Sequence, residues 1–243
     1  MSQSVKKNGK RRIEILRSAA AAFHRRGYYG ASVDAVARAL NMTGPNLYYY
    51  FKDKEEILFA CHDYGLDLLL DMLKQVEAST DPSEEKLHKL IVGFVRMMID
   101  EFNGSMLMLS VEGLSPRRLQ TIIKKRDRFD RGIRRIIQAE MNEGKIGKTE
   151  PKLISFAILG ALNWISRWYD PRRPANSEQI GEAFADYLCG FLIDRAPHRE
   201  KVTNRVGIAA QAGSCNRAAR HGNDKESGGR SSRLKALRAA SHG

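Results

Sequence analysis

The chain of 243 residues carries 41 Lys and Arg against 28 Asp and Glu, a formal net charge of +13. No stretch approaches the roughly 18 uncharged apolar residues that a membrane span needs. The basic N-terminus does not lead into the apolar run of a signal peptide, so we expect a cytoplasmic protein. Three cysteines without disulfide or metal spacing and six scattered histidines predict reduced thiols and no metal site.

The basic charge lies at the two ends of the chain. Residues 1–54 contain 11 Lys and Arg against 3 Asp and Glu, residues 195–243 contain the same numbers, and residues 55–194 contain 19 against 22. A basic block attracts the phosphates of nucleic acid, although an ordinary solvated surface has the same composition. For residues 1–54 we favour DNA binding because of the helices that this block surrounds.

The first helix is predicted from about Lys10 to Arg26, where Gly27 ends it. We interpret residues 1–9 as a disordered basic arm. Together with Lys10 and Arg11, the arm either follows the DNA backbone or minor groove or remains a solvated tail.

Two short helices follow with a tight connection between them, which is the arrangement of a helix-turn-helix. Ser32 caps the first helix and Thr43 caps the second, whose first turn suits Gly44 and Pro45. Apolar residues at helical spacing give the second helix an inner face of Leu47, Tyr50 and Phe51. Its outer face is polar, aromatic and basic, and consists of Asn46, Tyr48, Tyr49, Lys52 and Lys54. Such a helix can lie in a groove of DNA.

The run from Ala31 to Leu58 resembles the DNA-binding domain of the TetR family of bacterial transcriptional regulators. The pattern Leu-Tyr-x-Tyr-Phe-x-x-Lys, which begins at Leu47, is its most specific part. The resemblance implies a three-helix DNA-binding domain over residues 10–56, with phosphate contacts from the tyrosines and lysines of the outer face. The amide of Asn46 is suited to read adenine, and the small first turn suggests close backbone approach. The predicted DNA-binding residues are Lys10, Arg11, Ser32, Thr43, Gly44, Pro45, Asn46, Tyr48, Tyr49, Lys52 and Lys54.

The rest of the chain lacks strand-like alternation, and its long apolar-faced segments predict an all-α fold. We expect a ligand-binding and dimerisation domain over residues 57–196, with helices at 54–77, 83–102, 106–111, 117–143, 151–168 and 177–192. Residues 197–243 are rich in Gly, Ser, Ala, Asn and Arg, and are predicted to be a disordered basic tail.

The resemblance also implies a ligand cavity between residues 94 and 168, and methionines and aromatic residues there suit an adaptable apolar lining. A place in the plain core is the alternative for any one of them. The predicted ligand-binding residues are Phe94, Met97, Met98, Phe102, Met106, Trp164, Arg167 and Trp168. The basic run from Lys124 to Arg135 is interleaved with acids, which is typical of a solvated face with i, i+4 pairs. Alternatively, some of its arginines face an anionic ligand.

The last two predicted helices are strongly apolar and joined by a short loop, so we expect an antiparallel hairpin that needs a cover. Pairing the hairpin with its copy gives a four-helix bundle and a twofold homodimer, which suits a reader of palindromic half-sites. The predicted interface residues are Ile158, Leu162, Phe184, Tyr187, Leu188 and Phe191.

Residues 160–169 and 183–186 further resemble the C-terminal domains of TetR regulators of fatty-acid, steroid and aromatic catabolism, many of which respond to acyl-CoA thioesters. The implied function is a dimeric repressor that leaves a palindromic operator on double-stranded DNA when it binds a small apolar or acyl-CoA effector. An architectural or non-specific DNA-binding protein without an effector is the alternative. No nucleophile–base pair or Gly-rich phosphate loop supports an enzyme.

Overall fold

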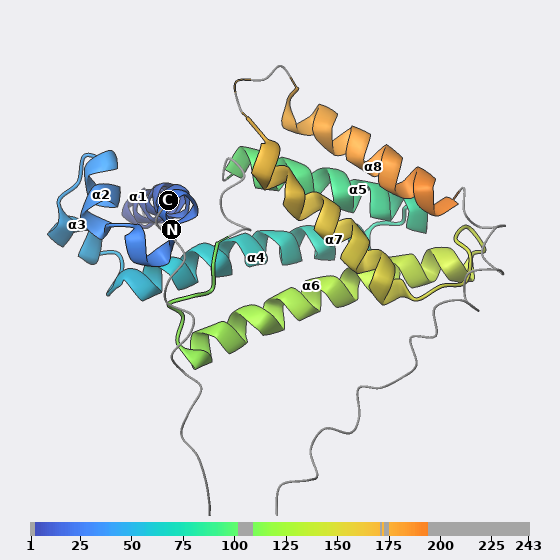
Figure 1. Cartoon of the computed structure of the whole chain (residues 1–243), viewed down its shortest axis with the longest axis horizontal. Helices are drawn as coiled ribbons and strands as arrows, with labels where there is room; N and C mark the ends of the chain where they lie inside the picture. Colours follow the sequence, from blue (N-terminus) through green and yellow to red (C-terminus); the bar gives the residue numbers. More distant parts are fainter. Residues whose placement is uncertain (1–2, 102–108, 171, 173–174, 194–243) are drawn as a thin grey trace, which may run out of the picture. The chain divides into compact units, whose positions relative to one another are not determined.

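The computed structural model describes residues 3–101, 109–170, 172 and 175–193, all within the compact unit Met1–Lys201. This part of the chain forms eight α-helices, one π-helix and no strand, which confirms the predicted all-α fold class (Figure 1). The elements are α1 (Gln3–Gly30), α2 (Val33–Ala39), α3 (Gly44–Tyr48), α4 (Lys54–Ala78), α5 (Ser83–Arg96), η1 (Met97–Glu101), α6 (Pro116–Asn142), α7 (Pro151–Trp168) and α8 (Ser177–Ile193). Within the described ranges, no helix has the length and apolar character to cross a membrane. The predicted tail at residues 197–243 lies outside the described residues.

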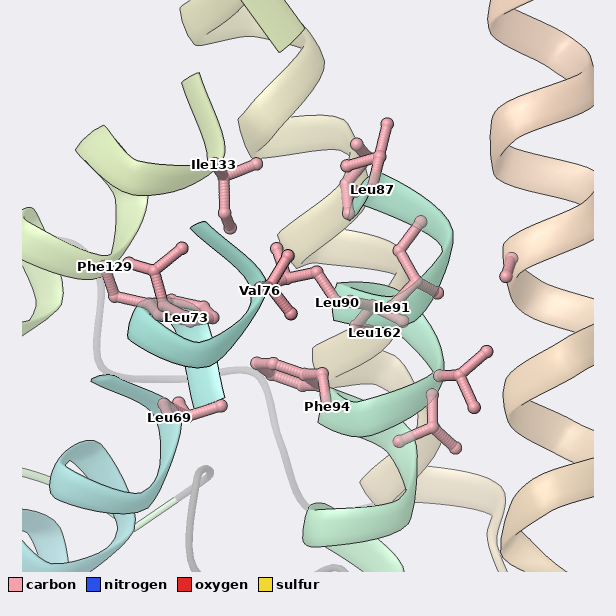
Figure 2. Close-up of a cluster of buried hydrophobic side chains, with 14 of the residues drawn as sticks. Leu69, Leu73, Val76, Leu87, Leu90, Ile91, Phe94, Phe129, Ile133 and Leu162 are labelled. Carbon is pink, nitrogen blue, oxygen red and sulfur yellow. The ribbon is translucent and has the colours of Figure 1, made fainter. Parts of the chain in front are cut away.

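The helices pack around two hydrophobic cores. The first core joins α1, α2 and α3 to the start of α4, and its most buried side chains include Ile15, Leu47, Phe51, Ile57 and Leu58. The second core joins the remainder of α4 to α5, α6, α7 and α8. Figure 2 shows side chains of this second core from α4 (Leu69, Leu73), α5 (Leu90, Phe94), α6 (Phe129, Ile133) and α7 (Leu162). Because α4 contributes to both cores, it links the N-terminal helices to the rest of the unit.

Helix α1 is longer than the sequence predicted. It begins at Gln3 rather than near Lys10, so the described part of residues 1–9 is helical. Lys, Arg and Gln are good helix formers, and extending an existing helix needs no new nucleus. At its other end α1 continues to Gly30 across a kink at Gly27, where φ is 68° and ψ is 171°.

The region after α5 also differs from the predicted helices. The expected helix 83–102 changes to the π-helix η1 at Met97, and of the expected helix 106–111 the described residues, 109–111, are not helical. Residues 109–115, which we call the connecting segment, lead directly into α6. The remaining predicted residues here, 102 and 106–108, lie outside the described ranges.

The last two helices pack mainly against other helices rather than along each other, in contrast to the predicted hairpin. Helix α8 lies along α5, and α7 packs against α6 (Figure 1). Near the loop that joins them, Trp168 stacks on Phe184 with ring centroids 6.2 Å apart. Helices α7 and α8 pack mainly against other helices because the inner apolar faces of both belong to the second core.

Candidate nucleic-acid interface and ligand cavity

Helices α2 and α3 form a helix-turn-helix held by local caps. The Ser32 hydroxyl accepts a hydrogen bond from the backbone N–H of Ala35, and the Thr43 hydroxyl accepts one from that of Asn46, each at 3.4 Å. The turn between the helices contains Asn41 in the left-handed region, with φ at 54°. Such caps satisfy N–H groups that a helix start leaves without partners. Ser32 and Thr43 therefore fix the two helices, and both remain exposed.

Helix α3 buries one face and exposes the other, as the sequence predicted. Leu47 and Phe51 are almost completely buried in the first core. Tyr48 and Tyr49 are 47% and 76% exposed, and Pro45, Asn46 and Lys52 are exposed as well. Exposed tyrosines beside an exposed amide and an ammonium group offer hydrogen-bond donors and positive charge, so this face is suited to a ligand such as DNA.

Gly44 is explained by packing within the domain. A Cβ at this position would lie 2.7 Å from Oδ1 of Asp34 on α2. The absence of a side chain therefore allows the start of α3 to approach α2 closely. Its small size does not by itself indicate contact with DNA.

Two of the predicted DNA-binding cations are engaged inside the domain. Arg11 donates to the carbonyl of Leu40 at the end of α2, at 2.8 Å, and pairs with Glu14. Lys54 donates to the carbonyl of Tyr29 at 3.4 Å, with its Nζ 4.7 Å from the ring centroid of Tyr28. Burial lowers the pKa of Lys54.

The geometry gives both cations a role in holding helices together. Of the other predicted lysines, Lys10 and Lys52 are exposed.

A cavity of about 750 Å³ lies between α4, α5, α6 and α7. It is lined by His62, Leu66, Leu69, Phe94, Leu109, Arg126, Asp127, Phe129, Asp130, Arg131, Arg134, Lys152, Phe156, Leu159 and Asn163. One wall is therefore apolar and another is rich in charge. A volume of this size suits a small molecule.

The predicted ligand-binding residues coincide with this cavity at Phe94 alone among those that the structure describes. Met98 is fully buried in the second core and Met97 packs against it. Trp164, Arg167 and Trp168 are exposed on the surface of α7 and do not line the cavity. Phe102 and Met106 lie outside the described residues. The sequence pattern identified large adaptable side chains, but it did not show which helix face each one occupies.

The charged wall comes from the basic run at residues 124–135, for which the sequence pattern favours a solvated face. Arg126, Arg131 and Arg134 line the cavity, a position that the alternative interpretation requires, and the anionic ligand itself stays a prediction. Arg126, Asp130 and Arg134 recur every four residues on α6, and this spacing was the signal that places them on one face. Arg134 pairs with Asp130, whose other oxygen accepts a hydrogen bond from Ser155 at 2.7 Å.

Arg126 and His62 meet at the cavity wall. Nη2 of Arg126 lies 3.5 Å from Nδ1 of His62, and Nε2 of His62 lies 3.4 Å from the carbonyl oxygen of Ser110. Burial, and then the neighbouring Arg126, lower the pKa of His62 to about 4. Burial lowers the pKa of Arg126 as well. The imidazole is therefore neutral at pH 7, with Nδ1 as acceptor and Nε2–H as donor.

Two of the predicted interface residues are not available to a partner. Ile158 and Leu162 are each 2% exposed because they face the core of the same chain. Phe184 and Leu188 are partly buried against that core, whereas Tyr187 and Phe191 are 77% and 53% exposed. Large exposed residues of α7 that the sequence did not single out for an interface are Leu153, Trp164 and Trp168, whereas the exposed Phe156 lines the cavity.

Among the residues that the structure describes, no group of three or more His, Cys, Asp or Glu side chains could hold a metal ion.

Comparisons with known proteins agree with this geometry. Residues 15–61 match the family model of bacterial regulatory proteins of the tetR family, and residues 80–192 match the tetracyclin repressor-like C-terminal domain. The transcriptional repressor KstR2 of Mycolicibacterium smegmatis is 24% identical over 187 residues, which cover 75% of this chain and 90% of that protein.

Solved structures give the same result. The regulator PfmR from Thermus thermophilus is 29% identical with a TM-score of 0.65, and the match covers 72% of this chain and 97% of that one. AibR, solved in complex with isovaleryl coenzyme A and operator DNA, is 25% identical with a TM-score of 0.63, over 75% of this chain and 98% of that one.

Proposed function

Because the chain belongs to the TetR family of bacterial transcriptional regulators, we propose that it is a cytoplasmic, dimeric repressor of a palindromic operator. It is a DNA-binding regulator and not an enzyme. In the proposed mechanism α3 reads the operator, and a small effector in the cavity between α4 and α7 releases the protein from DNA.

The exposed face of α3 is the observation that carries the proposal. Asn46 stands in the first turn of a helix whose start is fixed by the Thr43 cap and whose inner face is anchored by Leu47. In a helix-turn-helix the first residues of the second helix meet base edges, and an Asn amide pairs with adenine. Tyr48, Tyr49 and Lys52 flank it and are suited to hold phosphates.

Substitutions on this face test the assignment. We expect Asn46→Ala to lose about tenfold to a hundredfold of its discrimination between operator variants, because a bidentate base contact contributes about 1–3 kcal/mol. Lys52→Ala should weaken binding to all duplexes alike and reduce the slope of log affinity against log salt by about 1.8, because each of the two subunits loses one phosphate contact worth about 0.9. Selection from a random duplex library identifies the operator, and fluorescence anisotropy at several salt concentrations measures both effects.

Lys74→Ala provides the matched control. Lys74 is exposed on α4, about 30 Å of helix beyond Lys54 at 1.5 Å per residue. Its loss should leave both the discrimination and the salt slope unchanged. Selection of duplexes without a palindrome, or equal behaviour of Asn46→Ala and Lys74→Ala, would contradict the assignment of α3 to the groove.

We further propose that the effector is an acyl-CoA thioester. The apolar wall of Leu66, Leu69 and Phe94 suits an acyl chain, and the arginines on α6 suit anionic groups. The complex of AibR with isovaleryl coenzyme A supports this choice. The effector prefers a conformation in which the two reading helices no longer match the half-sites, so it lowers operator affinity in proportion to that preference. Failure of every member of an acyl-CoA panel to lower operator affinity would remove this effector class.

A homodimer is part of the same proposal. Trp164 is 63% exposed on α7, and Tyr187 and Phe191 are exposed on α8. Large aromatic side chains exposed in this way mark a surface that a second copy covers. A twofold dimer presents two copies of α3 to two half-sites.

A further inference from the structure

We propose that Arg126 and His62 form the anion-binding subsite of the cavity, and that an amphipathic anion bound there strengthens the hold of His62 on the connecting segment, which contacts the DNA-binding helices. The regulatory consequence rests on the proposed function. The new elements are the Arg126–His62 pair, which recognises the ligand's charge, and the connecting segment, which links the cavity to the DNA-binding domain. The ligand chemistry is an apolar body that carries a carboxylate, sulfonate or phosphate.

Arg126 is the cavity cation best suited to receive an anion. Arg134 on the same face pairs with Asp130, and Arg131 and Lys152, which also line the cavity, do not contact His62 among the described residues. Within the described residues Arg126 forms no ion pair, and its polar contact is the neutral imidazole of His62. Arg126 is exposed as a whole residue, but its guanidinium lies beside the buried His62, and burial of this group lowers its pKa. A guanidinium that has lost part of its hydration binds an anion more strongly than a fully hydrated one.

His62 connects this guanidinium to the main chain of another segment. Its Nδ1 accepts from Arg126 while its Nε2–H donates to the Ser110 carbonyl, so the imidazole joins α6 to the connecting segment. The other charged groups that line the cavity are Asp127, Asp130, Arg131 and Arg134 on α6 and Lys152 on α7. An anion on Arg126 competes with His62 for the guanidinium and offsets its positive field. Both effects favour the imidazolium, so binding of the anion is accompanied by uptake of a proton.

The connecting segment reaches from the cavity to the DNA-binding domain. Leu109 lines the cavity and is also buried in the first core, beside residues of α1 to α4. Gly113 lies against the ring of Tyr28, near the end of α1. The N–H of Ser115 donates to Glu55 in the first turn of α4, at 2.8 Å. A change at the Ser110 carbonyl therefore acts on a segment that contacts the helices carrying α3.

A matched pair of fluorescent probes tests the subsite in the full-length protein. Anilinonaphthalene sulfonate is an apolar aromatic anion, and N-phenylnaphthylamine has the same skeleton without the sulfonate. We expect Arg126→Gln to weaken binding of the sulfonate by about tenfold or more and to change binding of the neutral probe by less than about twofold, because a charge-assisted hydrogen bond is lost in one case only. Arg128→Gln, an exposed neighbour on α6 that does not line the cavity, should change neither.

Equal loss of both probes in Arg126→Gln, no loss of either, or no preference of the wild-type protein for the sulfonate would overturn the subsite. Helix content by circular dichroism and operator affinity without probe show whether a variant is folded. An intact operator response with a failed probe result removes the subsite and leaves the regulator. A confirmed subsite in a protein that selects no operator removes the proposed regulator and leaves the subsite.

The coupling between anion binding and proton uptake by His62 is measured separately. Calorimetric titration of the sulfonate at about pH 5.5, in two buffers that differ in ionisation enthalpy, should show proton uptake by the wild-type protein and almost none by His62→Gln. Hydrogen exchange of the amides of residues 109–115 should become slower in the wild-type complex, because an imidazolium donates a stronger hydrogen bond to the Ser110 carbonyl, and should not change when the sulfonate is added to Arg126→Gln. Equal proton uptake by the wild-type protein and His62→Gln, or unaltered exchange in the wild-type complex, would overturn the role of this relay.

Discussion

At the scale of single residues, Glu140 on α6 is a buried acid outside both candidate sites. It is 2% exposed, and among the described residues its Oε1 has no hydrogen-bond partner. Burial first, and then the nearby carboxylates of Glu84 and Glu143, raise its pKa to about 7, while Lys145 opposes them. Between its unfolded value and about pH 7 the folded state therefore binds a proton that the unfolded state has released. The free energy of unfolding falls as the pH rises through this range.

Replacing Glu140 by glutamine, its neutral isostere, should remove this loss of stability at high pH. We expect Glu140→Gln to be more stable than the wild-type protein by roughly 1–3 kcal/mol at about pH 8, and the difference to disappear near pH 4. Urea unfolding at several pH values measures it. Glu143→Gln is the control of opposite sign, because hydrogen bonds from Lys145 and Ser83 lower the pKa of Glu143. A Glu140→Gln protein with the wild-type pH dependence would contradict the buried-acid interpretation.

Residue roles could be predicted from the sequence where the cause is local. The caps at Ser32 and Thr43 and the inner position of Leu47 follow from helix spacing within a few residues. The DNA contacts of Arg11 and Lys54 stay predictions, and the sequence does not show that both side chains donate to the carbonyls of Leu40 and Tyr29, which are distant in the sequence. No local pattern predicts which distant carbonyl a long cationic side chain meets.

At the scale of elements, the connecting segment depends on Gly113. Its φ is 91°, and a Cβ there would collide with the ring of Tyr28. We expect Gly113→Ala to destabilise the protein by about 2 kcal/mol or more, because a strained backbone and a steric clash act together. Thermal and urea unfolding measure the loss. The variant should also respond less to effector, since the segment is displaced from the DNA-binding domain.

A substitution at Gly144 separates the cost of backbone strain from the cost of the steric clash. Gly144 has φ at 75°, but nothing lies within 4 Å of the position that a Cβ would occupy, so Gly144→Ala carries the backbone strain without the clash. It should cost about 1 kcal/mol. If the two glycine variants lost equal stability, the contact with Tyr28 would contribute nothing to holding the segment.

The sequence could not have predicted this part of the fold. Apolar spacing continues from Leu87 through Met98, so the pattern extends one helix to residue 102. The change to a π-helix at Met97 adds one residue to a turn without altering composition. The helix pattern likewise predicted apolar α7 and α8, but not that their inner faces belong to the second core rather than to each other.

At the scale of the whole molecule, the sequence predicted the protein family better than the position of the cavity. The motif around α3 is contiguous, whereas the cavity is assembled from four helices and the connecting segment. Trp164 and Trp168 show why the lining of a cavity is hard to predict from sequence. Large aromatic residues at helical spacing suit a cavity, a core or an interface equally, and the packing of α7 against α6 decides that they face outward.

The exposed face of α7 gives the last prediction, which concerns assembly. We expect Trp164→Glu to weaken the dimer by more than about tenfold, because a carboxylate would be buried without a partner in an apolar interface. Sedimentation velocity over a range of protein concentrations measures the dimer, and operator affinity should fall in parallel because one subunit holds one half-site weakly. Ile123→Glu is the control, since Ile123 is 45% exposed on α6, outside the proposed interface. A Trp164→Glu protein that remains dimeric at the concentrations where the wild-type protein does would place the interface elsewhere.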